Sequence, residues 1–294
     1  MQENIYDCSA REKYFNEFNS KYPEFETGII GRSILGKDID YYKIGKGEKR
    51  ILVVGAHHAT DYVTSSALYG FVDFLCENVA RGRVWNGINL DFLLRQHSYW
   101  IVPCINPDGV ELNLRGLENS PLKERLLRMN GGSLDFSKWQ SNARGVDLNR
   151  NYSFGFSEYK KTEAKQQIYA GKIGYSGVYP ESEPETRAVS GFIRAVMPYA
   201  VVGVYSEGKE IYYRPATKRQ GRIAEGLAAL VGYEASAKDT ALSQFGLVDY
   251  AGGVLGIPSF ALKVGKGEKP VTLLQLREIG DSVRKFLIFL PTRL

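Results

Sequence analysis

Short apolar runs alternate with amphipathic stretches along most of the 294 residues. Apolar residues recur at helical spacing from Val63 to Leu75, and a last amphipathic helix is expected over residues 273–290. Four runs have the length and apolar character of buried strands: residues 50–56, 99–105, 200–205 and 259–264. Because strands that alternate with helices form parallel sheets covered by helices, the pattern predicts a single α/β domain over residues 1–294. We expect three α/β/α layers around a mixed, mainly parallel sheet.

The N-terminal and middle parts of the chain add three further elements. An amphipathic first helix is expected over residues 14–22, and two short strands separated by turn residues predict a hairpin over residues 27–44. Ser182 and Glu185 have the spacing of a capping box, so we expect Ser182 to cap a helix that runs to about Val196.

The stretch from residue 106 to residue 180 has a different character. It is polar and Gly-rich and shows little periodicity, and a loop region of that length in a compact domain is usually functional. Polar or charged residues also follow four of the predicted strands directly. Because ligands of parallel sheets bind beyond the carboxyl ends of the strands, we expect the functional site at that edge.

Composition narrows the classes of protein. Hydrophobic residues make up 44% of the chain and charged residues 24%, which is ample apolar material for a core. The net charge of +5 is small and its basic residues are interleaved with acidic ones, so we expect no nucleic-acid partner. No apolar stretch approaches the roughly 20 residues that cross a bilayer, so we expect no membrane association. The oligomeric state stays open.

The cysteines and the first residues indicate a compartment. The three cysteines are widely spaced without CxxC pairing, which is typical of reduced, structural thiols. Residues 1–7 lack a basic region followed by an apolar run, so no signal peptide is expected. We therefore expect a cytoplasmic protein.

Six fragments, spaced along the chain, carry recognisable motifs. They are Gly55-Ala56-His57-His58-Ala59-Thr60-Asp61-Tyr62, Asn106-Pro107-Asp108-Gly109, Asn142-Ala143-Arg144-Gly145-Val146-Asp147-Leu148-Asn149-Arg150-Asn151, Gly174-Tyr175-Ser176-Gly177 with Ser182-Glu183-Pro184-Glu185-Thr186, Ser206-x-Gly208-x-Glu210-Ile211-Tyr212, and Pro258-Ser259-Phe260 with Val264-Gly265-x-Gly267. In this order they resemble the zinc carboxypeptidase family over nearly the whole chain. The fourth fragment in particular resembles the bacterial branch that cuts γ-D-glutamyl-diamino acid peptides of the cell wall. The resemblance implies that family's fold.

The resemblance also implies a set of chemical groups. An active member holds zinc through His, Glu and His and leaves one position open for water. A further Glu takes a proton from that water, and an Arg stabilises the oxyanion. An Asn-Arg pair binds the terminal carboxylate of the substrate through charge-assisted hydrogen bonds. In this sequence, Arg144, Asn149 and Arg150 are present and are assigned to binding the substrate carboxylate.

The positions for the metal and the general base carry other residues. His58 keeps the first ligand position, Asp61 stands where Glu is expected, and Tyr205 takes the place of the second His. A neutral phenol is a poor zinc ligand. Lys263 occupies the general-base position, where an ammonium group can accept no proton and repels a nearby cation. We therefore expect degenerate metal positions at His58, Asp61 and Tyr205, no intact catalytic residue and no cofactor.

Lys263 is expected to face the cleft. Strand alternation places it on one face with Ala261 and Gly265. A buried charge needs a partner, so we expect the Lys263 ammonium to contact Asp61 or Tyr205, where it would replace the charge of the metal.

Other residues have plainer interpretations. His57 is a neighbour of His58 in an extended segment and should point to the opposite face, which disfavours it as a substitute ligand. His97, Cys104 and Trp139 are expected to be structural. For Arg144, Asn149 and Arg150, the alternative to an anion pocket is structural salt bridging.

Four functions stay open. The preferred one is an inactive homologue whose pocket binds peptide or amino-acid carboxylates, such as those of peptidoglycan stem peptides. The second is an active metallocarboxypeptidase with an unusual zinc site built from His58, Asp61 and a non-standard third ligand; zinc enters only here. The third uses a deprotonated Lys263 as base or nucleophile. The fourth is a purely structural role.

Overall fold

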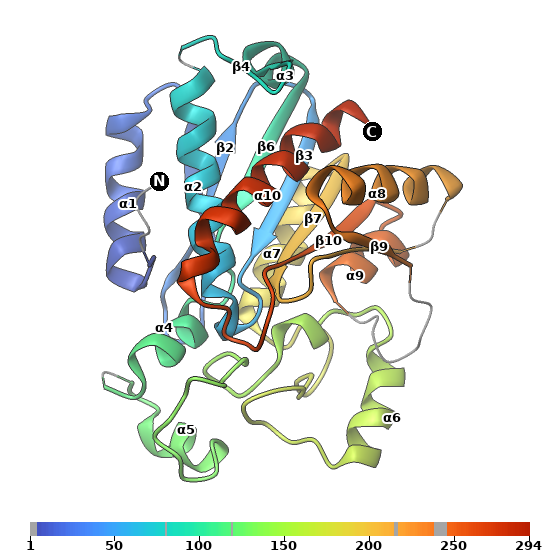
Figure 1. The fold of residues 1–294 in the computed structure, drawn as a ribbon. Helices are drawn as coiled ribbons and strands as arrows, with labels where there is room; N and C mark the ends of the chain where they lie inside the picture. Colours follow the sequence, from blue (N-terminus) through green and yellow to red (C-terminus); the bar gives the residue numbers. More distant parts are fainter. Residues whose placement is uncertain (1–4, 80, 119, 215–216, 238–245) are drawn as a thin grey trace.

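An eight-stranded mixed sheet forms the centre of the computed structural model, which describes residues 5–79, 81–118, 120–214, 217–237 and 246–294 (Figure 1). Its strands are β1 (Glu26–Arg32), β2 (Asp38–Ile44), β3 (Lys49–Gly55), β6 (His97–Val102), β7 (Ala200–Ser206), β8 (Glu210–Tyr213), β9 (Glu234–Ser236) and β10 (Ser259–Val264). Their order is β1-β2-β6-β3-β7-β10-β8-β9. The central strands β6, β3, β7 and β10 are parallel, whereas β1, β2 and β8 enter antiparallel pairs. The predicted mixed, mainly parallel sheet is confirmed.

Helices cover both faces of the sheet (Figure 1). They are α1 (Cys8–Lys21), α2 (Tyr62–Val79), α3 (Leu90–Gln96), α4 (Pro107–Arg115), α5 (Lys123–Met129), α6 (Phe156–Gln166), α7 (Pro184–Val196), α8 (Lys218–Val231), α9 (Leu247–Gly253) and α10 (Leu276–Phe289). The short 3₁₀ turns are η1 (Ala59–Asp61), η2 (Leu148–Arg150), η3 (Leu273–Gln275) and η4 (Leu290–Thr292), and β4 (Val84–Trp85) pairs with β5 (Ile88–Asn89) in a separate small hairpin. Residues of α2, α8 and α10 share one buried cluster, and residues of α7 and α9 share another.

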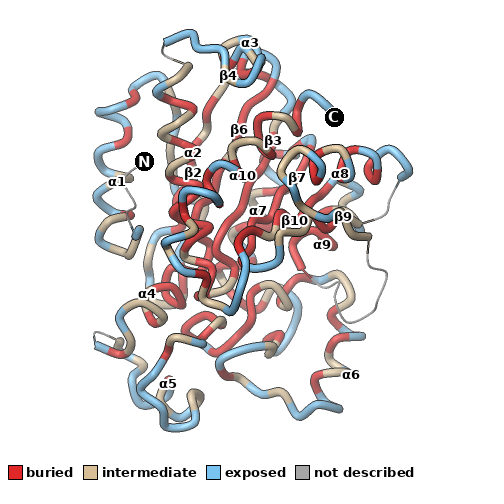
Figure 2. Tube along the Cα trace, in the orientation of Figure 1, coloured by how far each residue is buried: buried red, intermediate tan, exposed pale blue. Residues whose placement is uncertain are grey.

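The strand β3 shows why the sheet has two cores. Ile51 and Val53 belong to the cluster beneath α2 and α10, while Leu52 and Val54 belong to the cluster beneath α7. Successive side chains of a strand point to opposite faces, so a continuous apolar run is what a strand covered on both sides requires. The central strands are accordingly buried along their length (Figure 2). The expected three-layer arrangement follows directly.

The segment from residue 106 to residue 180 is more ordered than its sequence indicated. It contains α4, α5 and α6, of 9, 7 and 11 residues, together with η2. Helices this short make too few turns to give a clear periodic signal. The strand β8 and the helix α8, which the apolar pattern did not single out, complete the far side of the sheet.

The expected cap of α7 was wrong by one residue. The N-cap is Glu183, without a side-chain cap bond, and Pro184 is the first helical residue. Proline favours this first position and disfavours a helical conformation in the residue before it, so it sets the helix start. The Ser182 hydroxyl instead donates to Glu183 Oε1 at 2.9 Å.

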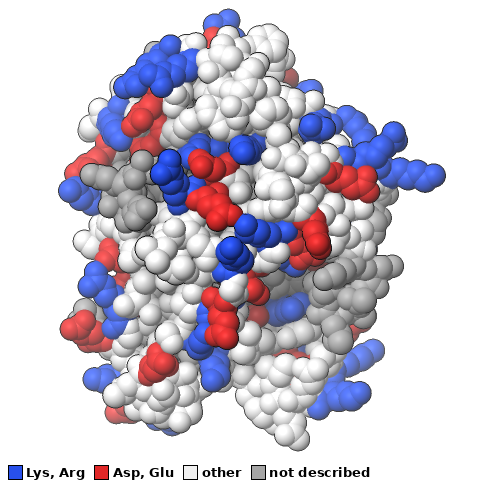
Figure 3. All heavy atoms as spheres, in the orientation of Figure 1, with Lys and Arg blue, Asp and Glu red and all other residues white. Residues whose placement is uncertain are grey.

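The strands β3, β7 and β10 end at the same edge of the sheet, and the segment 106–180 gathers beyond that edge (Figure 1). This is the edge where the sequence predicted the site. On the face drawn in Figure 3, acidic and basic side chains lie side by side across the middle. Within the described ranges, no helix has both the length and the apolar character needed to cross a bilayer.

Candidate functional site

A cavity of about 420 Å³ opens beyond the ends of β7 and β10. The predicted site residues that line it are His58, Asn149, Arg150, Tyr205 and Lys263. Lys269, Glu207, Glu210 and Asp249 line it as well, although no role was predicted for them. Asp61 lies behind this wall with no exposed surface, and Arg144 is not part of it.

After the end of β3, the side chains of the neighbouring residues His57 and His58 point in different directions, as strand geometry predicted. His57 is fully buried, and its Nε2 lies 2.9 Å from the Tyr152 hydroxyl. Burial, with His58 beside it, lowers the pKa of His57 to about 3, so this imidazole is neutral. His58 turns toward the cavity instead.

His58 lies between two buried carboxylates. Its Nδ1 is 3.0 Å from Asp61 Oδ2, and its Nε2 is 3.4 Å from Asp147 Oδ1. Burial and the Lys269 charge oppose protonation of the ring, but Asp147 and Asp61 outweigh them and raise the pKa of His58 above its ordinary value. Burial likewise opposes ionisation of Asp147, and His58 nevertheless lowers the pKa of that carboxyl to about 2. No role was predicted for Asp147, although it lies in the recognised fragment 142–151 and contacts His58.

Asp61 uses both carboxylate oxygens within the protein. Oδ2 faces His58, and Oδ1 accepts a hydrogen bond from the Ser206 hydroxyl at 2.7 Å. The Lys269 ammonium lies 3.6 Å from the same Oδ1. Burial alone would raise the pKa of Asp61, but Lys269, His58 and Ser206 together hold it below the ordinary value. Asp61 is therefore an ionised group inside an internal network.

Lys263 points into the cavity as expected, but the partner expected for it was wrong. Its Nζ lies 2.5 Å from Glu210 Oε2. The reason is register, because Lys263 of β10 stands directly opposite Glu210 of the antiparallel strand β8. Side chains of such a cross-strand pair are close neighbours. The cation beside Asp61 is Lys269, from the loop after β10.

Tyr205 contacts the loop that carries Asn149. Its hydroxyl donates to Asn149 Oδ1 at 3.0 Å, and the same oxygen accepts from the backbone N–H of Leu247 at 3.2 Å. Burial and the nearby carboxylates of Asp61 and Asp249 raise the pKa of Tyr205 well above its ordinary value, so the phenol is protonated. Tyr205 thus positions Asn149 and offers no anionic oxygen to a metal.

These donors do not fit a zinc ion. Zinc sites take at least three protein ligands with free lone pairs. Here His58 and Asp61 are two such groups, but Tyr205 at the third position is a protonated phenol whose hydroxyl donates to Asn149. In the part of the chain that the structure describes, no three His, Cys, Asp or Glu side chains are grouped to hold a metal ion.

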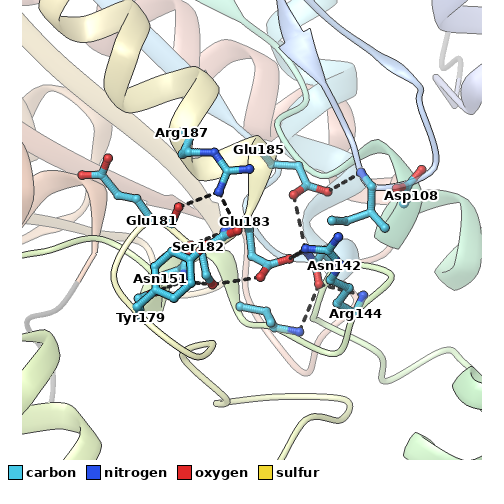
Figure 4. Close-up of polar contacts among 12 residues, drawn as sticks. Asp108, Asn142, Arg144, Asn151, Tyr179, Glu181, Ser182, Glu183, Glu185 and Arg187 are labelled. Atoms are coloured by element: carbon cyan, nitrogen blue, oxygen red, sulfur yellow. Dashed lines mark hydrogen bonds and ion pairs between the residues drawn. The ribbon is translucent and has the colours of Figure 1, made fainter.

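A buried polar cluster supports the loop that carries Asn149 and Arg150 (Figure 4). Asn142 donates to Glu183 Oε2 at 2.9 Å, while its own Oδ1 accepts from the backbone of Arg144 and Val146. Asn151 Nδ2 donates to the backbone oxygen of Ser176 at 2.7 Å. The loop is therefore held from beneath by the start of α7.

Arg144, Asn149 and Arg150, the three residues assigned to binding the substrate carboxylate, do not all lie in one place. The Arg144 side chain is 46% exposed and lies 3.8 Å from Glu183, outside the cavity. The Arg150 guanidinium stacks 4.9 Å above the Tyr159 ring, and no carboxylate of the described residues lies within ion-pair distance of it. Asn149 and the cationic Arg150 therefore line the cavity, while Arg144 matches the salt-bridging alternative.

Glu185 in the same cluster gives a pH prediction. Burial, with Asp108 and Glu183 nearby, raises its pKa from 4.5 to about 8. Between pH 4.5 and about pH 8 the folded protein therefore holds one proton more than the unfolded chain. The free energy of unfolding consequently falls as the pH rises toward 8. The loss is up to about 1.4 kcal/mol per pH unit. We expect Glu185→Gln to flatten this slope in urea titrations from pH 5 to pH 8. The exposed Glu158→Gln should keep the wild-type slope, and equal slopes for all three proteins would contradict the prediction.

The remaining candidates are structural. His97 is buried and its Nδ1 lies 3.3 Å from the backbone oxygen of Leu93. Cys104 and Trp139 have no exposed surface, and the three cysteines are unpaired.

Comparisons with known proteins agree with the fold and the motifs. The chain matches the zinc carboxypeptidase family over residues 11–253. It is 27% identical to gamma-D-glutamyl-L-diamino acid endopeptidase 1 of Lysinibacillus sphaericus over 278 residues, which is 93% of this chain and 69% of that protein.

Solved structures show the same fold. Bovine thrombin-activatable fibrinolysis inhibitor in complex with tick carboxypeptidase inhibitor superposes with a TM-score of 0.76 at 19% identity, over 99% of this chain and 97% of that chain. Murein-tripeptide amidase MpaA from Escherichia coli O157 gives a TM-score of 0.53 at 18% identity, over 88% and 91%. The resemblance read from the six fragments is confirmed, and the chain belongs to the zinc carboxypeptidase family.

Proposed function

We propose that this protein binds peptides or amino acids by their free carboxylate and does not hydrolyse them. The observation that carries this proposal is the Arg150 guanidinium, which lines the cavity beside Asn149 with no carboxylate partner among the described residues. The neighbouring lysines are already paired, Lys263 with Glu210 and Lys269 with Asp61. A ligand carboxylate would supply the anion that Arg150 lacks, through charge-assisted hydrogen bonds.

The ligand class follows from the relatives and from the other wall of the cavity. A 27%-identical relative is an endopeptidase for γ-D-glutamyl-L-diamino acid bonds. Glu207 lines the cavity of this chain as an exposed side chain and offers negative charge to the second amino group of a diamino acid. We therefore propose cell-wall-type γ-D-glutamyl-diamino acid peptides as ligands.

The absence of hydrolysis in this proposal rests on the general-base position. A general base must accept a proton from the attacking water. Lys263 cannot do so as an ammonium, and its Nζ donates to the Glu210 carboxylate at 2.5 Å. The same contact occupies the Lys263 side chain, which argues against its acting as a nucleophile.

Metal analysis and calorimetry test the proposal together. The protein purified without added metal is analysed for zinc and then titrated with γ-D-glutamyl-diaminopimelate in the presence of EDTA. We expect substoichiometric zinc, ligand binding that EDTA leaves unchanged, and no cleavage product on prolonged incubation. The control is the same peptide with its carboxylates amidated, which should not bind.

The alternative is an active metallocarboxypeptidase, which is supported by the 3.0 Å distance between His58 and Asp61, two of the family's ligand positions. Stoichiometric zinc, with peptide cleavage that EDTA abolishes and zinc restores, would establish that alternative and reject our proposal.

A further inference from the structure

The loop between β10 and η3 brings a lysine to the innermost wall of the cavity. The Lys269 ammonium lies 3.6 Å from Asp61 Oδ1, and the Lys269 side chain is 22% exposed while that of Asp61 is fully buried. Among the described residues, His58 and Lys269 are the cationic groups within ion-pair distance of Asp61. Lys263, which occupies the general-base position, is paired elsewhere.

The position of Lys269 is fixed by contacts along its own loop. The Gln275 side chain makes two hydrogen bonds to the backbone of Lys266. Its Oε1 accepts from the Lys266 N–H at 3.1 Å, and its Nε2 donates to the Lys266 carbonyl oxygen at 2.9 Å. The Lys138 ammonium donates to the backbone oxygen of Lys269 at 2.6 Å. Val271 is buried and pins the end of the loop to the core. The loop therefore holds the ammonium at the site before any ligand arrives.

Charge balance shows what this ammonium does there. Asp61 and Asp147 are two buried carboxylates, and a buried charge without a counter-charge is strongly unfavourable. In an active member of the family a divalent zinc ion would offset such charges. In this chain His58 contacts both carboxylates and Lys269 contacts one, so the protein's own side chains provide the compensation.

We propose that Lys269 is a built-in cation that takes the place of the metal, stabilises the buried Asp61 carboxylate and keeps divalent cations out of the site. This goes beyond the proposed ligand binding and does not depend on it. A divalent ion approaching Asp61 would meet the fixed positive charge of Lys269, and repulsion at such short range in a poorly solvated site is strong. Lys269 is accordingly a positioning residue.

The test compares Lys269→Met with Lys266→Met, an exposed lysine three positions earlier in the same loop. Thermal unfolding is recorded for the full chain with EDTA and with Zn²⁺, and Co²⁺ absorption reports coordination directly. We expect wild type and Lys266→Met to show no cobalt spectrum and no Zn²⁺-dependent rise in Tm. Lys269→Met should lose a few degrees of Tm in EDTA. Combined with Tyr205→His, which supplies a third ligand beside His58 and Asp61, it should regain part of that loss with Zn²⁺ and give a cobalt spectrum, whereas Tyr205→His alone should do neither. The charge-conserving Lys269→Arg should behave as wild type.

A double-mutant comparison provides a second, metal-free readout. If Lys269 stabilises Asp61, then Lys269→Met should cost much less Tm in an Asp61→Asn background than in wild type. The proposal is overturned if the two losses are equal, or if Tyr205→His responds identically to Zn²⁺ and Co²⁺ with and without Lys269→Met. Because no step uses a peptide ligand, failure of ligand binding would reject the proposed function and leave this inference standing.

Discussion

Arg150→Gln is expected to weaken binding of a carboxylate-bearing peptide by at least about 30-fold, which corresponds to a loss of about 2 kcal/mol. The substitution removes a guanidinium that lines the cavity without a carboxylate partner among the described residues. Its planar fork provides two parallel hydrogen bonds to a carboxylate, which the Gln amide cannot reproduce. Isothermal titration with γ-D-glutamyl-diaminopimelate in EDTA measures the loss.

Arg144→Gln is the matched control, from the same loop and with the same change of charge. Arg144 is half exposed and lies outside the cavity. We expect its substitution to change affinity by less than about threefold, because solvent screens an exposed charge outside the cavity. Equal losses for the two variants would show that net charge, and not the Arg150 contact, governs binding.

Arg11→Met is expected to destabilise the protein by about 3–5 kcal/mol, since it leaves a buried carboxylate without its cation. The Arg11 and Asp40 side chains are each 5% exposed and lie 2.8 Å apart. Arg11 also donates to the Tyr69 hydroxyl at 3.3 Å and to the backbone oxygen of Asp38 at 3.1 Å. These contacts hold α1 against β2. Urea unfolding followed by circular dichroism measures the shift in midpoint.

Arg32→Met in the neighbouring hairpin is the control for this prediction. Arg32 and Asp38 form an ion pair at 2.7 Å, but their side chains are 70% and 45% exposed. Its loss should cost less than about 1 kcal/mol. If Arg11→Met were as mild as Arg32→Met, the buried pair would contribute no more than a solvated one and the prediction would be wrong.

Local sequence signals predicted the elements that local chemistry controls. The apolar runs at residues 50–56, 200–205 and 259–264 became β3, β7 and β10, because a strand covered on both faces needs apolar residues at every position. Short helices and strands such as α5 and β8 give no such signal, since their few residues are placed by packing. The helix α8 has 14 residues, but its buried apolar residues are spaced along one face and form no continuous run, so the apolar runs did not indicate it.

Motifs located the site but not the contacts within it. His58, Asn149, Arg150, Tyr205 and Lys263 line one cavity, as the order of the fragments indicated. Strand alternation also predicted that Lys263 faces that cavity. Its partner could not be read from alternation, because the pair with Glu210 depends on the register between β8 and β10.

The sequence by itself determined the family, the sheet and the edge at which the cavity lies. Each of these depends on residue identity or on short-range periodicity. Only the tertiary structure decided which cation faces Asp61, because Lys269 reaches it through a loop closed by Gln275, Lys138 and Val271. It also decided that Arg150 faces the cavity while Arg144 points away. Contacts of this kind depend on how distant segments meet, and no local pattern along the chain encodes that meeting.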